Sequence, residues 1–247
     1  MPFTISHVAA VLPMTRAKRL SLPLAALAAG SMAPDYLYFV PPLINYGELL
    51  HEPKYAFTFG IIAAFAAWTI WRVLAPGLYE IAPQWLRSRW DLQSWKQFPW
   101  WKNLMAFATG IATHLVLDSF THSWGVGATR IGILSEGYVT PVGTLAGYEL
   151  AQNLLSGLGL IILAIALVKT KPTQHKLSST PKIQGLAVLL IPLSAVVGAV
   201  VRTGIVGGFD SRYEALAFYL LTGAVAGAAL AALVLGLAAM GTRMSAR

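Results

Sequence analysis

Two histidines and an aspartate recur at four-residue intervals in the segment Ala112-Thr-His114-Leu-Val-Leu-Asp118-Ser-Phe-Thr-His122. Side chains four residues apart lie on one stripe of an α-helix, because each step of four advances only about 40°. Imidazole and carboxylate groups are the ligands that a zinc-type ion takes, and burying them unpartnered in an apolar segment would cost several kcal/mol. The motif therefore predicts a bound divalent metal ion.

The composition predicts that this motif lies in a membrane protein. Of the 247 residues, 56% are hydrophobic and only 11% are charged, which is outside the usual range of soluble domains. We expect an all-α fold, a polytopic helical membrane bundle with five to six membrane segments and a short N-terminal helix, forming a single domain over residues 1–247. Six apolar runs approach the roughly 20 residues that cross a bilayer: Leu22 to Val40, Ala56 to Leu74, Leu104 to Phe120, Asn153 to Val168, Gly185 to Val201 and Ala215 to Met240.

The first of these runs has an alternative interpretation. It contains Gly30, Pro34 and Asp35, which are unusual together in a continuous membrane helix. A broken or re-entrant helix buried within the bundle is the alternative, since such a break is tolerated where protein surrounds it.

Lysine and arginine residues between the apolar runs indicate the orientation. By the positive-inside rule their four clusters predict cytoplasmic loops, and these are Arg16 to Arg19, Arg72 to Lys102, Lys169 to Lys182, and Arg243 with Arg247. The intervening loops, Pro41 to Tyr55, Thr121 to Gln152 and Arg202 to Glu214, are then expected to face outward. The net charge of +8 is spread over loops, so it does not indicate nucleic-acid binding. Without cysteine, thiolate metal sites are excluded.

The loop from Ala75 to Lys102 combines tryptophans with cations. Such a mixture is typical of an amphipathic helix at the headgroup layer, with membrane lipids as its partner. A platform for a lipid substrate is the alternative interpretation. The tryptophans concerned are Trp85, Trp90, Trp95, Trp100 and Trp101.

Counting residues from the cytoplasmic clusters places other polar side chains at the same depth in the membrane as the motif. At a rise of about 1.5 Å per residue, His7 and His114 each lie roughly 18 Å from their cytoplasmic clusters, and Asp35 and Asp118 roughly 24 Å. His51 lies in the first outward loop and could fold back over the site. Mixed nitrogen and oxygen ligation suits zinc first and manganese or iron second. The candidate metal ligands are His7, Asp35, His51, His114, Asp118 and His122.

Two of these candidates also have simpler interpretations. Asp35 follows Pro34 and could be the N-cap of a helix that restarts there. His114 and Asp118 could form a hydrogen-bonded structural pair without any ion.

Three motifs carry a resemblance to a known family. Met-Pro-Phe-Thr-Ile-Ser-His7, Gly30-Ser-Met-Ala-Pro-Asp35-Tyr and Gly110-Ile-Ala-Thr-His114-Leu-Val-Leu-Asp118-Ser-Phe-Thr-His122, in this order, resemble the bacterial membrane proteins grouped as domain of unknown function 4184. The resemblance covers nearly the whole chain and implies a multi-pass protein of the bacterial inner (cytoplasmic) membrane. The chain is more distantly similar to membrane-bound metal-dependent hydrolases, and more distantly again to zinc-dependent phospholipase C and the single-strand-specific nucleases of that helical fold.

The more distant resemblance implies a ligand assignment. Asp35, His51, His114 and Asp118 would hold one zinc ion, and Asp118 would bridge to a second ion held also by His7. His122 would match a ligand of a third ion. Those enzymes complete the third position with a later His-xxx-Glu pair, which this chain lacks; the one substitute is Glu149. We therefore expect one or two ions.

Together these features predict metal-dependent hydrolysis of a phosphoester, with a lipid or lipid-linked substrate bound near the outer face. Asp35 or Glu149 would orient the attacking water, and Arg130 or Arg202 would hold the phosphate through charge-assisted hydrogen bonds. One alternative is a metal or proton transporter, which the apolar inner halves of the long segments disfavour. The other is a structural membrane protein in which a metal ion holds helices together. The sequence does not predict the oligomeric state.

Overall fold

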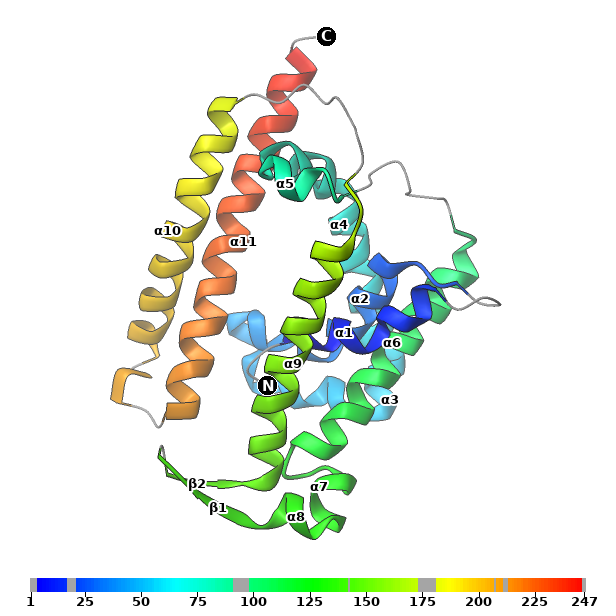
Figure 1. Ribbon diagram of the computed structural model, residues 1–247, viewed down its shortest axis with the longest axis vertical. Coiled ribbons are helices and arrows are strands. Elements are labelled where there is room, and N and C mark those ends of the chain that lie inside the picture. The colour runs from blue at the N-terminus through cyan, green and yellow to red at the C-terminus, as the bar shows by residue number, and fades with distance from the viewer. Residues whose placement is uncertain are drawn as a thin grey trace. The chain divides into compact units, whose positions relative to one another are not determined.

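The computed structural model describes residues 4–16, 21–90, 98–141, 143–172, 181–206, 208–210 and 213–245 (Figure 1). The chain divides into two compact units, and each is described by itself. Unit 1 comprises Met1–Trp68 and Gln97–Ala166, and unit 2 comprises Thr69–Lys96 and Leu167–Arg247. The sequence predicted a single domain. This stays a prediction, because a division into two compact units does not show whether each unit folds by itself.

Within the residues that the structure describes, five helices are long and apolar enough to cross a membrane, which confirms the predicted all-α, multi-pass fold. They cover Pro53–Ile81, Trp100–Arg130, Gly147–Lys169, Ile183–Ile205 and Ala215–Gly241. The short N-terminal helix is also present as the apolar segment Thr4–Thr15.

The first predicted membrane run, residues 22–40, is a broken helix. Its α-helical part, α2 (Leu24–Met32), is followed directly by a 3-10 helix, η3 (Ala33–Phe39), with Pro34 near its start. Proline lacks the N–H that an α-helix needs in its interior, so the hydrogen-bonding pattern changes there. The alternative interpretation of this run was therefore the right one, and the break brings Asp35 into a buried position.

Unit 1 contains the elements that carry the candidate ligands. The N-terminal segment consists of η1 (Thr4–His7), α1 (Val8–Val11) and η2 (Leu12–Thr15). After α2 and η3, the chain continues through η4 (Pro41–His51), α3 (Pro53–Tyr55), a π-helical turn η5 (Ala56–Gly60), α4 (Ile61–Ile81), α6 (Trp100–Thr121) and α9 (Gly147–Lys169). Helices α4 and α9 run on into unit 2.

Close packing of α2 against α6 forms the centre of unit 1. A Cβ atom added to Gly110 would collide with the carbonyl of Leu27, and one added to Gly30 would collide with the carbonyl of Phe107. The two backbones are therefore in direct contact. The apolar core around this crossing includes Leu27, Ile111 and Phe107, all almost fully buried.

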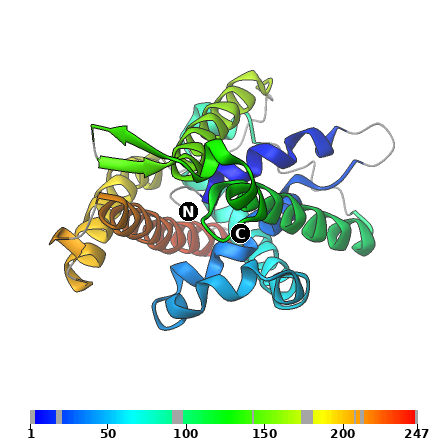
Figure 2. The same cartoon turned by 90° about the horizontal axis from the view of Figure 1, so that it is seen from below.

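The connector between α6 and α9 contains an element that the sequence analysis did not predict. It consists of α7 (Val126–Arg130), α8 (Gly132–Ser135) and an antiparallel hairpin of β1 (Gly137–Thr140) and β2 (Gly143–Ala146). Gly143 has a φ of 121°, a conformation that favours glycine and that closes the turn. Figure 1 shows the connector at the bottom of the view, and Figure 2 looks onto it from that end.

Unit 2 contains α5 (Gln84–Arg87), α10 (Pro181–Ile205), η6 (Gly208–Asp210) and α11 (Tyr213–Ser245). Helices α10 and α11 pack closely where Gly198 of one meets Gly223 and Gly227 of the other. Small residues at such crossings are typical of membrane helices. The sequence predicted a tryptophan-rich amphipathic helix in this region. Trp85 lies in α5, and Trp100 and Trp101 begin α6. Trp95 lies outside the described residues.

Candidate metal centre

Four side chains from three elements of unit 1 converge on one buried point. Asp35 lies in the first turn of η3, His51 ends η4, and His114 and Asp118 lie one turn apart in α6. Each offers one ligand atom, and these four atoms all lie within 4.8 Å of one another. All four residues are buried, at 9% exposure or less. This group can hold a metal ion.

The separations between these atoms are close to those around a tetrahedral ion. His51 Nε2 lies 3.3 Å from Asp35 Oδ1 and 3.3 Å from Asp118 Oδ2. His114 Nε2 lies 3.7 Å and 3.1 Å from the same two oxygens, and 3.3 Å from His51 Nε2. Ligands about 2.0 to 2.1 Å from a tetrahedral centre are about 3.3 Å apart. The side chains therefore need little movement to bind an ion.

Backbone carbonyls orient both imidazole rings. His114 Nδ1 donates a hydrogen bond to the carbonyl of Ser31 at 2.7 Å, and His51 Nδ1 donates one to the carbonyl of Gly47 at 3.2 Å. Because a carbonyl can only accept, each Nδ1 carries its proton, so Nε2 is the atom of each ring that can bind an ion at the centre. This arrangement is the usual outer-shell support of metal-binding histidines.

The two buried carboxylates favour a positively charged group at the centre. Asp35 and Asp118 are almost fully buried, and no oxygen of either accepts a well-aligned hydrogen bond from the part of the chain that the structure describes. Two buried carboxylates this close together would be strongly destabilising without a cation beside them. A divalent ion matches both the charge and the donor set, although the donor set does not identify the metal.

The other oxygen of Asp118 faces two further histidines. Its Oδ1 lies 3.7 Å from His7 Nε2 and 3.7 Å from His122 Nδ1. The ring of His7 also stacks on that of His114, with centroids 4.0 Å apart. The structure thus brings four of the six predicted ligands into one group, and it places His7 and His122 each 3.7 Å from the other oxygen of Asp118.

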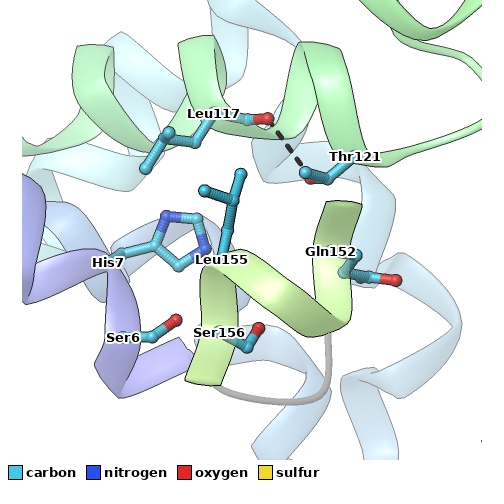
Figure 3. A pocket seen from close by; sticks show the side chains of 7 residues that line it. All are labelled: Ser6, His7, Leu117, Thr121, Gln152, Leu155 and Ser156. Atoms are coloured by element: carbon cyan, nitrogen blue, oxygen red, sulfur yellow. Dashed lines mark hydrogen bonds between the residues drawn. The ribbon is translucent and has the colours of Figure 1, made fainter. Parts of the chain in front are cut away.

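A small cavity with both polar and apolar lining residues lies beside His7 on this second side. It has a volume of about 30 Å³ and is lined by Ser6, His7, Leu117, Thr121, Gln152, Leu155 and Ser156. Figure 3 shows His7 between residues of α6 and residues of α9. The side-chain amide of Gln152 lies 3.4 Å from His122 Nε2. A cavity of this size has room for about two water molecules, and its polar side chains can bind them.

The family model for Domain of unknown function (DUF4184) matches residues 1–237. The chain belongs to this family. No curated protein and no solved structure matches the chain. The family confirms the closest resemblance noted in the sequence, and for this DUF4184 protein the chemistry must be argued from the site itself.

The remaining predicted site residues lie elsewhere. Glu149 accepts a hydrogen bond from the backbone N–H of Ala146 at 2.7 Å, so its carboxylate caps the start of α9. Arg130 is exposed at the end of α7. Arg202 belongs to unit 2, where its guanidinium lies 6.0 Å from the ring centroid of Phe218. Their roles toward water and phosphate stay predictions.

Three contributions to the site were missed in the sequence. The carbonyls of Ser31 and Gly47 carry no sequence signal, because any residue supplies a carbonyl. Trp124 stacks on His122, with centroids 5.3 Å apart, and meets His51 edge-on at 5.9 Å. For Trp124, the sequence offered one indication of this role, namely its position two residues after His122.

His51 makes the metal-free protein sensitive to pH. Burial lowers its pKa, but the carboxylates of Asp118 and Asp35, each 3.3 Å from His51 Nε2, outweigh burial and raise the pKa to about 9 from 6.5. A raised pKa in the folded state gives stability that is complete below pH 6.5 and is lost as pH rises through about 9. With a chelator present, we expect the melting temperature to fall across this range. His51→Gln should make that fall smaller. If the melting temperature of the variant fell as steeply with pH as that of wild type, the assignment to His51 would be contradicted.

Proposed function

We propose that this protein is a metal-dependent hydrolase of the bacterial cytoplasmic membrane that cleaves a phosphoester of a lipid or lipid-linked substrate near the outer face. Zinc is the proposed ion, with manganese or iron second. The observation that carries the proposal is the position of Asp118, whose two oxygens face two separate groups of imidazoles at 3.1 to 3.7 Å. One carboxylate between two such groups suits a pair of ions.

The two groups differ in how complete they are. On one side, Asp35, His51, His114 and Asp118 already supply four protein ligands, which is typical of a closed site. On the other side, His7 and His122 each lie 3.7 Å from Asp118 Oδ1, which makes these three residues candidate ligands, and the small cavity lies next to His7. Catalytic zinc sites commonly keep three protein ligands and an open position. We therefore assign the reaction to the second side and a supporting role to the first.

A divalent cation bound there would polarise a phosphoryl oxygen and lower the pKa of a neighbouring water molecule. The chain's own groups hold and orient the reactants. Thr121, Ser156 and Gln152 line the cavity with two hydroxyls and an amide, so they can position water beside His7. Arg130, exposed on the connector, provides a donor for the phosphate at the membrane surface.

A structural role, in which a metal ion only holds helices together, is the second candidate function. The closed four-ligand group favours it, because its ligands tie η3, η4 and α6 together. Structural metal sites contribute directly to folding stability. Under this alternative, chelation would melt the fold while no phosphoester is ever cleaved.

Hydrolysis by the purified protein tests the proposal. In mixed micelles with zinc or manganese, wild-type protein should release phosphate from phosphatidic acid or the headgroup from phosphatidylcholine. His7→Ala should abolish release yet keep the ion of the four-ligand group, whereas Glu136→Gln, an exposed change on the connector, should behave as wild type. A wild-type rate no higher than that of the double variant His114→Ala, Asp118→Ala would overturn the enzymatic function.

A further inference from the structure

The connector between α6 and α9 exposes an unusual number of apolar side chains. Both flanking helices are long enough to cross a membrane, so the connector lies where the chain leaves and re-enters the bilayer. A loop in water would be expected to be polar. Instead the exposed fractions are 91% for Val139, 66% for Ile133, 58% for Val126, 48% for Trp124 and 40% for Ile131.

The apolar residues occur with few charges. Between residues 123 and 146 the charged residues are Arg130 and Glu136, both exposed. Exposed apolar area of this kind costs roughly 25 cal/mol per Å² in water. Tryptophan and arginine next to aliphatic side chains are instead favourable at the level of lipid headgroups, where rings and stems are in contact with acyl chains and cations with phosphates.

The hairpin limits how deeply the connector can enter the membrane. Among the described residues, β1 and β2 pair with one another and form a two-stranded sheet. The outer edges of such a sheet present backbone groups that need water or headgroups as partners, since the hydrocarbon core satisfies none of them. The connector therefore suits the interfacial layer and not the bilayer interior.

The connector is fixed to the metal centre through Trp124. A Cβ atom added to Gly125 would collide with the carbonyl of Ser119, so the chain turns tightly against the end of α6. This turn stacks the half-exposed indole of Trp124 on His122, with its edge toward His51. One side of Trp124 thus faces two candidate ligands while much of the ring remains exposed.

We propose that residues 123–146 form an interfacial membrane anchor that dips into the lipid headgroup layer beside the metal centre, with Trp124 as the wall between the centre and lipid. The partner is the bilayer itself. The inference rests on the membrane-spanning helices and the exposed apolar side chains, not on hydrolysis, so it stands or falls separately from the proposed function.

Site-directed spin labelling tests the anchor directly, because the chain contains no cysteine. Ile133→Cys and Val139→Cys would each be labelled with a nitroxide in vesicles of phosphatidylcholine and phosphatidylglycerol. Leu158→Cys, exposed on the apolar surface of α9, and Lys171→Cys, exposed after that helix, serve as the lipid and water references.

The measured quantity is the ratio of collision rates with oxygen, which partitions into lipid, and with a water-soluble nickel chelate. We expect both connector labels to give ratios several-fold above that of Lys171→Cys and below that of Leu158→Cys. A ratio equal to the water reference at either connector position would overturn the proposal. Because the positions are exposed, the thermal unfolding of each labelled variant should match that of the unlabelled protein, which checks that the fold is kept.

Discussion

Asp118→Asn is expected to remove bound metal almost completely. The substitution keeps the volume of the side chain but removes the charge that faces His51 and His114 through one oxygen, and His7 and His122 through the other. Loss of even an outer-shell partner costs about 10- to 100-fold in metal affinity, so loss of a ligand shared by both groups should exceed about 100-fold. Elemental analysis of purified protein after dialysis against a weak chelator measures the effect.

The matched comparison for this variant is Asp35→Asn. Its carboxylate contacts His51 and His114 and belongs to the four-ligand group alone. We expect Asp35→Asn to weaken that group and to leave binding by His7, His122 and Asp118 measurable. Glu136→Gln, an exposed acid-to-amide change, controls for loss of charge in general. Equal metal loss in the two aspartate variants would contradict the shared role of Asp118.

Gly110→Ala is the second substitution with a large expected effect. Its new methyl group would collide with the carbonyl of Leu27 on α2, so the two helices would have to separate. Overpacking of this kind destabilises by about 1 to 3 kcal/mol. The shift should also weaken metal binding, because His114 lies one turn further along α6 and donates to the carbonyl of Ser31 on α2. Thermal unfolding and metal titration in detergent measure the two effects.

Gly157→Ala is the control for this prediction. Gly157 lies in α9, and a Cβ atom added there meets nothing within 4 Å. Since alanine is favoured over glycine in helices by about 1 kcal/mol, this variant should be as stable as wild type or slightly more stable. If Gly110→Ala bound metal with wild-type affinity, contact between α2 and α6 would not determine the geometry of the centre.

Much of the fold and of the ligand set could be predicted because it depends on strong periodic signals. The four-residue spacing of His114, Asp118 and His122 depends on helix geometry alone, and the approach of His7 and Asp35 follows from helix rise. In the structure Asp35, His51, His114 and Asp118 lie together, and His7 approaches Asp118, whereas their role as ligands stays a prediction.

What could not be predicted depends on features without a distinctive residue pattern. The carbonyl of Ser31 orients His114 across the crossing of α2 and α6, and only the paired glycines Gly30 and Gly110 hint at that approach. The hairpin is made of short strands whose alternation is too brief to recognise in sequence. Glu149 was assigned a role toward water from its position, whereas its hydrogen bond to Ala146 is local.

The hydrogen bond from His114 to Ser31 joins residues 83 apart in the chain. Neither α2 nor α6 can form the metal centre alone, because the ligands lie on both sides of α4, which must be threaded into the bilayer between them. During biosynthesis the centre can therefore assemble only after the first half of the protein has been inserted and packed. Any ion that this group binds would then be acquired late in maturation, and a chain that fails to insert correctly would have no site for it.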